Sequence, residues 1–297
     1  MTALFSSTAD LRQYVRISAT LPWDSISCYV DSALDMYLRR YLSDEVMTAL
    51  DSDSTFLTLS RKALAPLAVY LAADEMAVMI GDAGITVQNE KDKRAVASDR
   101  KIQKARESLQ ERGLMALSVL LEYVASRDGL DLSTCPRLES MKGMLLSTLA
   151  AFEEYVSLQG SFVAFLEIVP TMKGIERRLE RELGAPLMAR IRTQSDSETI
   201  LALHECCRSY VAYATASLLS SERTRRQRMA GERIEWHGLV RPLFEDSEER
   251  QGWYQKMEGE SMAAIRGIIE SHSTELGMEH SDSRVDYHGK GKRIFYI

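Results

Sequence analysis

The sequence lacks the motifs that mark most catalytic and metal-binding proteins. Its four cysteines, Cys28, Cys135, Cys206 and Cys207, form no CxxC pair and show no spacing typical of metal ligands. No GxSxG, HExxH or kinase-like set of motifs occurs either. These absences favour a protein that is not an enzyme and that needs no cofactor or metal. The cysteine pattern favours a reducing, cytosolic setting.

Long apolar runs and charge of one sign are also scarce. Met1–Leu4 lacks the basic and apolar regions of a signal peptide, and no apolar run approaches the roughly 20 residues that span a bilayer. The net charge of −6 is divided evenly, because residues 1–150 carry 17 Lys+Arg and 20 Asp+Glu while residues 151–297 carry 20 and 23. We therefore expect a soluble intracellular protein with no membrane partner, in which neither half is a basic nucleic-acid module.

Internal self-similarity is the main feature that is present. When the sequence is shifted by 141 positions, Leu4–Leu50 lies over Leu145–Ile191 without a gap, and nine of the 47 positions are identical. The identical pairs include Tyr14/Tyr155, Arg40/Arg181 and Leu42/Leu183, and apolar positions coincide elsewhere. Repetition of this kind indicates two copies of one supersecondary unit.

Helical periodicity fills both copies. Ile26, Val30, Leu34, Leu38 and Leu42 recur every four positions and predict a helix from about Pro22 to Leu42 with one buried stripe. Further helices are predicted over Phe56–Met79, Asp99–Ser126, Glu198–Ser221 and Glu249–Ser271, and short strands at Ile85–Val87 and Arg233–Trp236. The expected fold is all-α, mainly helical with short β-hairpin-like strands, and is a tandem duplication of a small helical-bundle unit.

Boundary signals divide the chain into four parts. Ser7 and Ser43 can each cap a short helix, and Gly184 with Pro186 can separate two helices at the matching place in the second copy. The predicted parts are a first helical domain at residues 1–130, a linker at 131–143, a second helical domain at 144–280, and an extended C-terminal arm at 281–297.

Residue types that bind metals or phosphate do occur, but in unsuitable patterns. His204–Cys207 are neighbours on a predicted helix, where consecutive side chains point in different directions. His272, His280, Asp282 and His288 match no known ligand spacing. Gly289–Lys292 lacks the GxxxxGK[ST] pattern of a phosphate loop and is interpreted as a basic arm.

Two surface candidates remain. The densest positive run is Arg223, Arg225, Arg226, Arg228 and Arg233, which is either a solvated helix end linked to nearby glutamates or a contact for DNA backbone or an acidic protein surface. The chain ends in four consecutive large apolar residues, which are either unstructured or dock on another subunit as an added strand or clip. These residues are Ile294, Phe295, Tyr296 and Ile297.

The opening pattern resembles the head–tail connector (adaptor or neck) proteins of tailed bacteriophages. It runs Leu11–Ile17 and then Ile26–Leu34, with Tyr41-Leu42 in the place of the family's closing Tyr-Leu. The turn Gly81–Ile85 and the basic-aromatic tail Lys292–Phe295 resemble an uncharacterised, double-length group from phages and prophages of Bacteroidetes-type bacteria. The resemblance covers nearly the whole chain, whereas typical connectors carry one unit and this chain carries two.

The resemblance implies a structural protein that forms a ring beneath the portal and extends the DNA channel. Implied partners are further copies of itself, the portal protein, the next neck or tail protein, and DNA in the channel through non-specific contact. Implied locations are the host cytoplasm during assembly and then the virion neck. Two rival readings stay open: a non-catalytic bacterial helical-repeat module that binds a peptide or partner helix, and an enzyme with a site between the copies.

Overall fold

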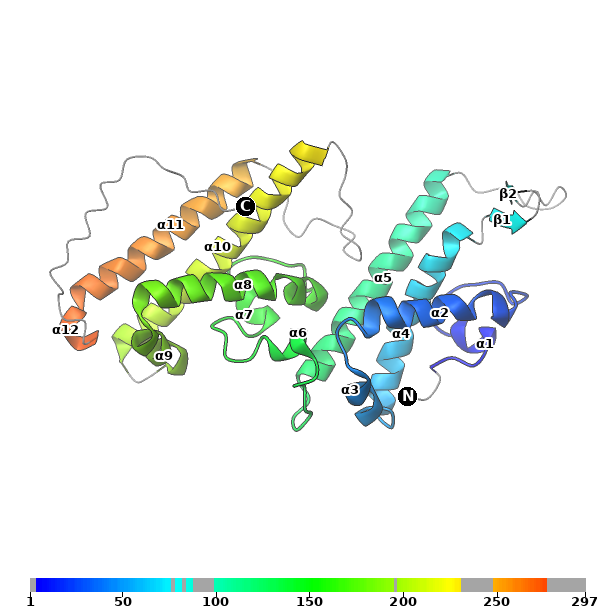
Figure 1. The fold of residues 1–297 in the computed structure, drawn as a ribbon, viewed down its shortest axis with the longest axis horizontal. Helices are drawn as coiled ribbons and strands as arrows, with labels where there is room; N and C mark the ends of the chain where they lie inside the picture. Colours follow the sequence, from blue (N-terminus) through cyan, green and yellow to red (C-terminus); the bar gives the residue numbers. More distant parts are fainter. Residues whose placement is uncertain are drawn as a thin grey trace.

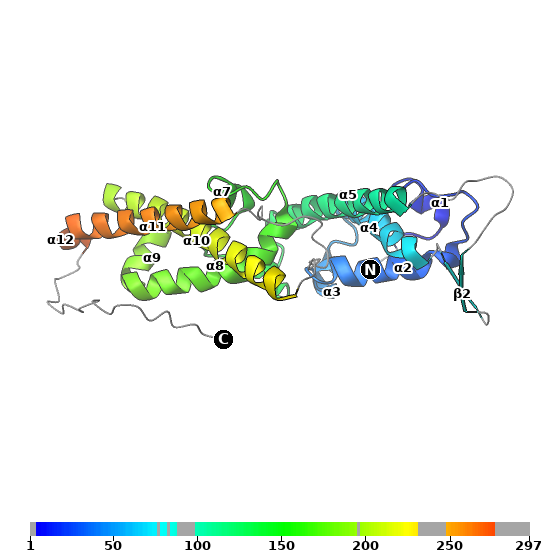
Figure 2. The same cartoon turned by 90° about the horizontal axis from the view of Figure 1, so that it is seen from above.

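The protein is mostly helical. The computed structural model describes residues 4–75, 78–81, 84–87, 99–194, 197–230 and 248–276, and most of these residues are helical. Figure 1 shows two helical halves side by side, each built around a pair of long neighbouring helices. Viewed from above, α5 (Asp99–Ala125) and α11 (Glu248–Ser271) lie along one long side, and α2 (Ser27–Ala33) and α8 (Phe162–Leu183) along the opposite side (Figure 2).

The first half begins with short helices and ends with two long ones. Its remaining elements are α1 (Thr8–Leu11), the 3-10 turn η1 (Trp23–Ser25), the π-helical turn η2 (Leu34–Leu38), α3 (Asp44–Ala49), α4 (Ser54–Glu75) and strands β1 (Val78–Gly81) and β2 (Gly84–Val87). The two strands pair antiparallel, with Val78 opposite Val87. Residues Ile85–Val87, for which the sequence predicts a strand, lie in β2. The predicted strand at Arg233–Trp236 lies outside the described residues.

The second half follows the same order of helices. Its elements are α7 (Leu149–Glu153), α8, α9 (Ala185–Thr193), α10 (Glu198–Ala230), α11 and the short α12 (Ser273–Leu276), and α6 (Pro136–Glu139) precedes them. Each half contains two long neighbouring helices, α4 and α5 in the first and α10 and α11 in the second, whereas α2 has 7 residues and α8 has 22.

The predicted helix boundaries marked by caps are confirmed. The Ser7 hydroxyl accepts the Asp10 N–H at the start of α1, and the Ser43 hydroxyl accepts the Val46 N–H at the start of α3. Gly184 ends α8 with φ of +81°, a conformation that a residue without a side chain adopts at little cost, and Pro186 lies in the first turn of α9.

Other predicted boundaries are wrong. The helix expected over Pro22–Leu42 is broken into η1, α2 and η2, and it ends at Leu38. α10 continues nine residues beyond the predicted end at Ser221, to Ala230. Apolar periodicity marks which side of a helix is buried, but it does not determine where the backbone hydrogen bonds change from one helical type to another.

The burial pattern inside this helix follows a spacing that differs from the predicted gap-free alignment of 141 positions. The buried residues Ile26, Val30 and Ala33 match the buried Phe165, Val169 and Met172, which lie 139 rather than 141 positions later. The preceding caps, Pro22 and Ser161, show the same spacing. The spacing returns to 141 at the buried Leu42 and Leu183. The first half therefore has two more residues before this helix and two fewer within it.

α4 forms the centre of the first half. The sequence predicts no apolar run long enough to span a bilayer, but by length and composition alone Ser54–Ala73 could cross one; half of this span is buried within the fold. Its neighbour α5 approaches closely at Gly113, where an added Cβ would lie 2.5 Å from Leu67 Cγ and 3.3 Å from the Ala63 carbonyl oxygen. Such a distance requires a residue without a side chain.

Four residues of the predicted linker belong to the apolar core. Within residues 131–143, Leu132, Cys135, Leu138 and Met141 are buried. They belong to one apolar cluster that extends through both halves. The predicted C-terminal arm at 281–297 lies outside the described residues.

Candidate functional site

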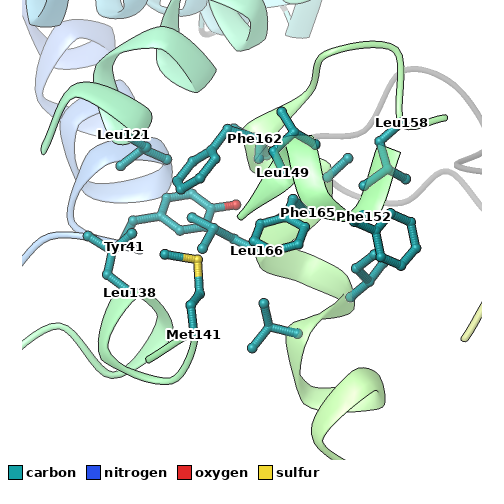
Figure 3. Packing of buried hydrophobic residues seen from close by; sticks show 14 of the residues in the cluster. Tyr41, Leu121, Leu138, Met141, Leu149, Phe152, Leu158, Phe162, Phe165 and Leu166 are labelled. Atoms are coloured by element: carbon teal, nitrogen blue, oxygen red, sulfur yellow. The ribbon is translucent and has the colours of Figure 1, made fainter. Parts of the chain in front are cut away.

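An apolar junction joins the two halves. Leu121 from α5 and Tyr41, which follows η2, face Phe162 at the start of α8 (Figure 3). Their exposed fractions are 0%, 5% and 3%. Leu138 and Met141, from the segment between the halves, lie on the other side of the Tyr41 ring (Figure 3). Each half therefore contributes buried surface to the other, and the junction excludes water.

Glu167 of α8 gathers the polar groups of this junction. Its carboxylate accepts hydrogen bonds from Arg40 Nη2 at 3.0 Å to each oxygen and from the Tyr41 hydroxyl at 2.8 Å. It also accepts from Arg137 Nη1. Nearby, the Val163 N–H donates to the Ser118 hydroxyl at 3.2 Å across the same junction. Two arginines, one phenol and one carboxylate thus join three separate segments of the chain.

The electrostatics of this cluster favour its present protonation states. Burial, together with the neighbouring Glu167, raises the pKa of Tyr41 well above its ordinary value, so the phenol stays protonated and donates. The guanidinium carbons of Arg40 and Arg137 lie 5.8 and 5.3 Å from the centre of the Tyr41 ring, within the range of cation–π attraction. Because donors occupy both carboxylate oxygens, the arrangement is suited to holding the halves together rather than to proton transfer.

The π-helical turn η2 contributes to this geometry. The Arg39 N–H donates to the Leu34 carbonyl at 2.9 Å, and the Tyr41 and Leu42 N–H groups both return to the Leu38 carbonyl. In the second half, α8 continues as a regular helix to Leu183. π-turns are rare and concentrate where a helix must present particular side chains. Here the turn precedes the two residues, Arg40 and Tyr41, that reach Glu167.

The segment His204–Cys207 forms no metal centre. His204 contacts Gln194 at 3.1 Å, and burial lowers its pKa. Glu205 accepts from the Tyr155 hydroxyl, and burial raises the pKa of the Cys207 thiol to about 12. Among the residues that the structure describes, no group of three His, Cys, Asp or Glu side chains could hold a metal ion.

A row of aromatic side chains crosses the second half. Tyr155 and Tyr213 stack edge-to-face at 6.0 Å, and Tyr213 and Trp253 do so at 5.4 Å. Arg208 covers the Tyr155 ring at 5.6 Å and pairs with Glu154 at 2.6 Å. Trp253 is 45% exposed. The aromatic row is therefore fixed on one side and accessible at its Trp253 end.

The predicted surface residues lie either in the last turns of α10 or outside the described residues. Arg223, Arg225, Arg226 and Arg228 are in the last three turns of α10, of which only the backbone is described. A helix C-terminus is where the backbone dipole favours positive charge. Arg233 and the apolar tail residues Ile294, Phe295, Tyr296 and Ile297 lie outside the described residues.

Glu167 is the residue that sequence reasoning missed. It is the one charged residue in the run Phe162–Pro170, which is otherwise apolar. A carboxylate in such a run is rarely buried without partners. That signal was available in the sequence, but its partners Arg40, Tyr41 and Arg137 lie 30 to 127 positions away.

Comparison with known proteins gives one match. The family described as "Family of unknown function (DUF6712)" matches residues 27–129. This matched range makes up less than half of the chain. The match begins with α2 and ends just after α5, so it covers most of the first half and none of the second. No curated protein and no solved structure matches the chain.

Proposed function

We propose that this chain is a structural protein, a head–tail connector of a tailed phage or prophage that forms a ring beneath the portal during virion assembly. The observation that supports this best is the junction around Glu167, where two helical units with the same order of helices are fixed side by side. A ring of connectors needs stiff units that present a different face to each neighbour. The contact of Tyr41 and Leu121 in the first half with Phe162 in the second joins two different faces in this way.

The proposal includes a tandem duplication. In the first half, α1, the broken segment η1–α2–η2 and α3 precede the long α4 and α5; in the second half, α7, the long α8 and α9 precede the long α10 and α11. The match to residues 27–129 ends where the first of these units ends. The proposed role involves no catalysis and no cofactor.

The proposed partners are further copies of the chain, the portal protein and the next neck or tail protein. The protein would act in the host cytoplasm and then in the virion neck. Arg223, Arg225, Arg226, Arg228 and Arg233 would contact channel DNA non-specifically or an acidic surface. Ile294–Ile297 would dock on a neighbouring subunit.

Electron microscopy of the purified protein, alone and mixed with the portal protein of the same genome, tests the proposal. Rings, or an added layer of density on the portal, are expected. Arg225→Glu with Arg226→Glu, and a truncation after Gly289, would then show whether the arginines and the tail take part in assembly. Particles that never exceed one chain and ignore the portal would overturn the connector function.

The aromatic row favours a second candidate, a non-catalytic helical-repeat module that binds a protein. Trp253 is 45% exposed and packs edge-to-face on the partly buried Tyr213, and Trp and Tyr are among the residues enriched at binding hot spots. Such a module would remain a monomer or dimer and would bind a peptide with quenching or enhancement of Trp253 fluorescence. Loss of that signal in Trp253→Phe, without loss of ring assembly, would separate the two functions.

A further inference from the structure

The junction inside the chain buries a face of α5 whose counterpart on α11 is open. In the first half, Leu114, Ser118 and Leu121 are all buried. The matching residues of the second half, 148 positions later, are Met262, Arg266 and Ile269. Met262 and Ile269 are only partly buried, and Arg266 is exposed. These three residues, which follow one face of α11 at i, i+4 and i+7, are called the trailing edge.

The other side of the junction also has an open counterpart. Phe162 and Glu167 of α8 are covered by the first half. With the spacing of 139 positions, their counterparts are Trp23 and Cys28. Trp23 is partly buried, whereas Cys28 is exposed, as are Asp24 and Asp31 beside it. Cys28 and Asp31 lie on one face of α2, and Asp24 lies in the preceding turn η1; with Trp23 these residues are called the leading edge.

The two edges carry opposite charge. The trailing edge has Arg266, and Arg181 at the end of α8 matches Arg40, which binds the Glu167 carboxylate in the junction. Arg181 is exposed, and its Nε donates only to the Arg177 carbonyl one turn earlier, at 3.2 Å. The leading edge has Asp24 and Asp31. Arginine therefore recurs on the trailing side and carboxylate on the leading side, as in the junction, although Glu182 stands in place of Tyr41 and Cys28 in place of Glu167.

We propose that the trailing edge of one chain binds the leading edge of a second copy of the same chain, repeating head to tail the junction that joins the two halves. This inference rests on the proposed function and names the surfaces through which its subunits meet. The partner is a second copy because the two edges are the open counterparts of two surfaces that already bind each other. A contact between unlike faces repeats until the subunits close into a ring or extend as a filament.

Charge reversal tests the contact. Arg266→Glu and Asp24→Arg alter exposed residues, so both variants should fold with an unchanged helical spectrum. Each is expected to weaken association at least about tenfold, because like charges brought together in an interface are strongly unfavourable. The double variant should recover most of the loss. The matched control is Lys256→Glu on α11, about 15 Å along the helix from Arg266, which should leave association unchanged.

Cross-linking tests the geometry. Glu182 matches Tyr41, whose hydroxyl contacts Glu167, and Cys28 matches Glu167. Glu182→Cys should therefore be joined by a short bismaleimide to Cys28 of a neighbouring chain, and should give a ladder of multimers on a denaturing gel. Lys256→Cys, the equally exposed control, and the wild-type chain should give none.

Sedimentation measures association of the free chain. If the free chain is a monomer, association is measured instead as the number of copies bound to each portal. Assembly that is insensitive to both reversals and gives no ladder would overturn the contact and leave the connector function standing. A chain that is monomeric both alone and with the portal would overturn both. If the truncation after Gly289 increases the ladder, the segment after that residue competes for the trailing edge. If the truncation abolishes assembly while the reversals do not, the tail rather than these edges joins the subunits.

Discussion

Replacement of Gly113 by alanine is expected to destabilise the contact between α4 and α5. The new Cβ would lie 2.5 Å from Leu67 Cγ and 2.7 Å from Leu67 Cδ2, whereas carbon atoms in good contact are about 3.5–4.0 Å apart. Leu67 is completely buried, so its side chain cannot move into solvent. One of the two helices must therefore shift, or Leu67 must leave its preferred rotamer.

The size of the effect follows from two opposing terms. Alanine in place of glycine inside a helix stabilises it by about 1 kcal/mol. Overpacking of a filled core costs about 1–3 kcal/mol. The net loss for Gly113→Ala is then about 0–2 kcal/mol. Gly259 on α11 is an exposed helical glycine with no atom within 4 Å of an added Cβ, so Gly259→Ala receives only the favourable term.

Thermal unfolding followed by circular dichroism measures both variants. Since the helix-propensity term is common to them, the difference between their melting temperatures isolates the clash, and we expect Gly113→Ala to melt roughly 2–10 °C below Gly259→Ala. Leu67→Ala should cost less in the Gly113→Ala background than in the wild type, because it removes the clashing atoms. Equal melting temperatures for the two glycine variants would refute the close approach of α4 and α5.

Three further predictions concern the junction and its surroundings. Glu167→Gln should destabilise the protein by about 1–2 kcal/mol, which is less than the loss of a fully buried ion pair because both arginines are about one-third exposed. The control Glu260→Gln breaks an exposed pair with Lys256 and should change stability by less than about 0.5 kcal/mol. Equal effects of the two variants on thermal melting would contradict the role of Glu167. Burial raises the pKa of the Glu176 carboxyl above its ordinary value of 4.5, and the neighbouring Arg192 opposes this shift. The protonated carboxyl therefore contributes to stability below pH 4.5, and this contribution is lost as the pH rises through the raised pKa. The melting temperature of Glu176→Gln should therefore rise relative to that of the wild type as the pH rises above 4.5. A difference in melting temperature that does not depend on pH would argue against the raised pKa. Ser43→Ala removes the α3 cap and the 2.7 Å contact with Thr134, and should cost about 1 kcal/mol by thermal melting; no loss would mean that the cap is dispensable.

Local signals in the sequence were sufficient for the helical class and for several boundaries. Ser7, Ser43, Gly184 and Pro186 act on backbone groups within four residues of themselves, so their effect can be foreseen without tertiary structure. The apolar repeats of the long helices α5 and α11 likewise gave ends correct to within one residue. The tandem duplication and the surface roles of the arginines and the tail remain predictions.

Only the tertiary structure shows which residues meet in the junction. Tyr41 and Arg40 reach Glu167 from the residues that follow η2, and the apolar repeat of Ile26–Leu42 does not distinguish a π-turn from an α-helix. The segment 131–143 has a polar, turn-rich start typical of a linker, yet four of its residues are buried, and two of them, Leu138 and Met141, lie against the Tyr41 ring (Figure 3). Sequence determines short-range structure through neighbours along the chain. Contacts between residues more than a hundred positions apart are selected by the burial of complementary surfaces, which becomes visible only when the two halves are folded together.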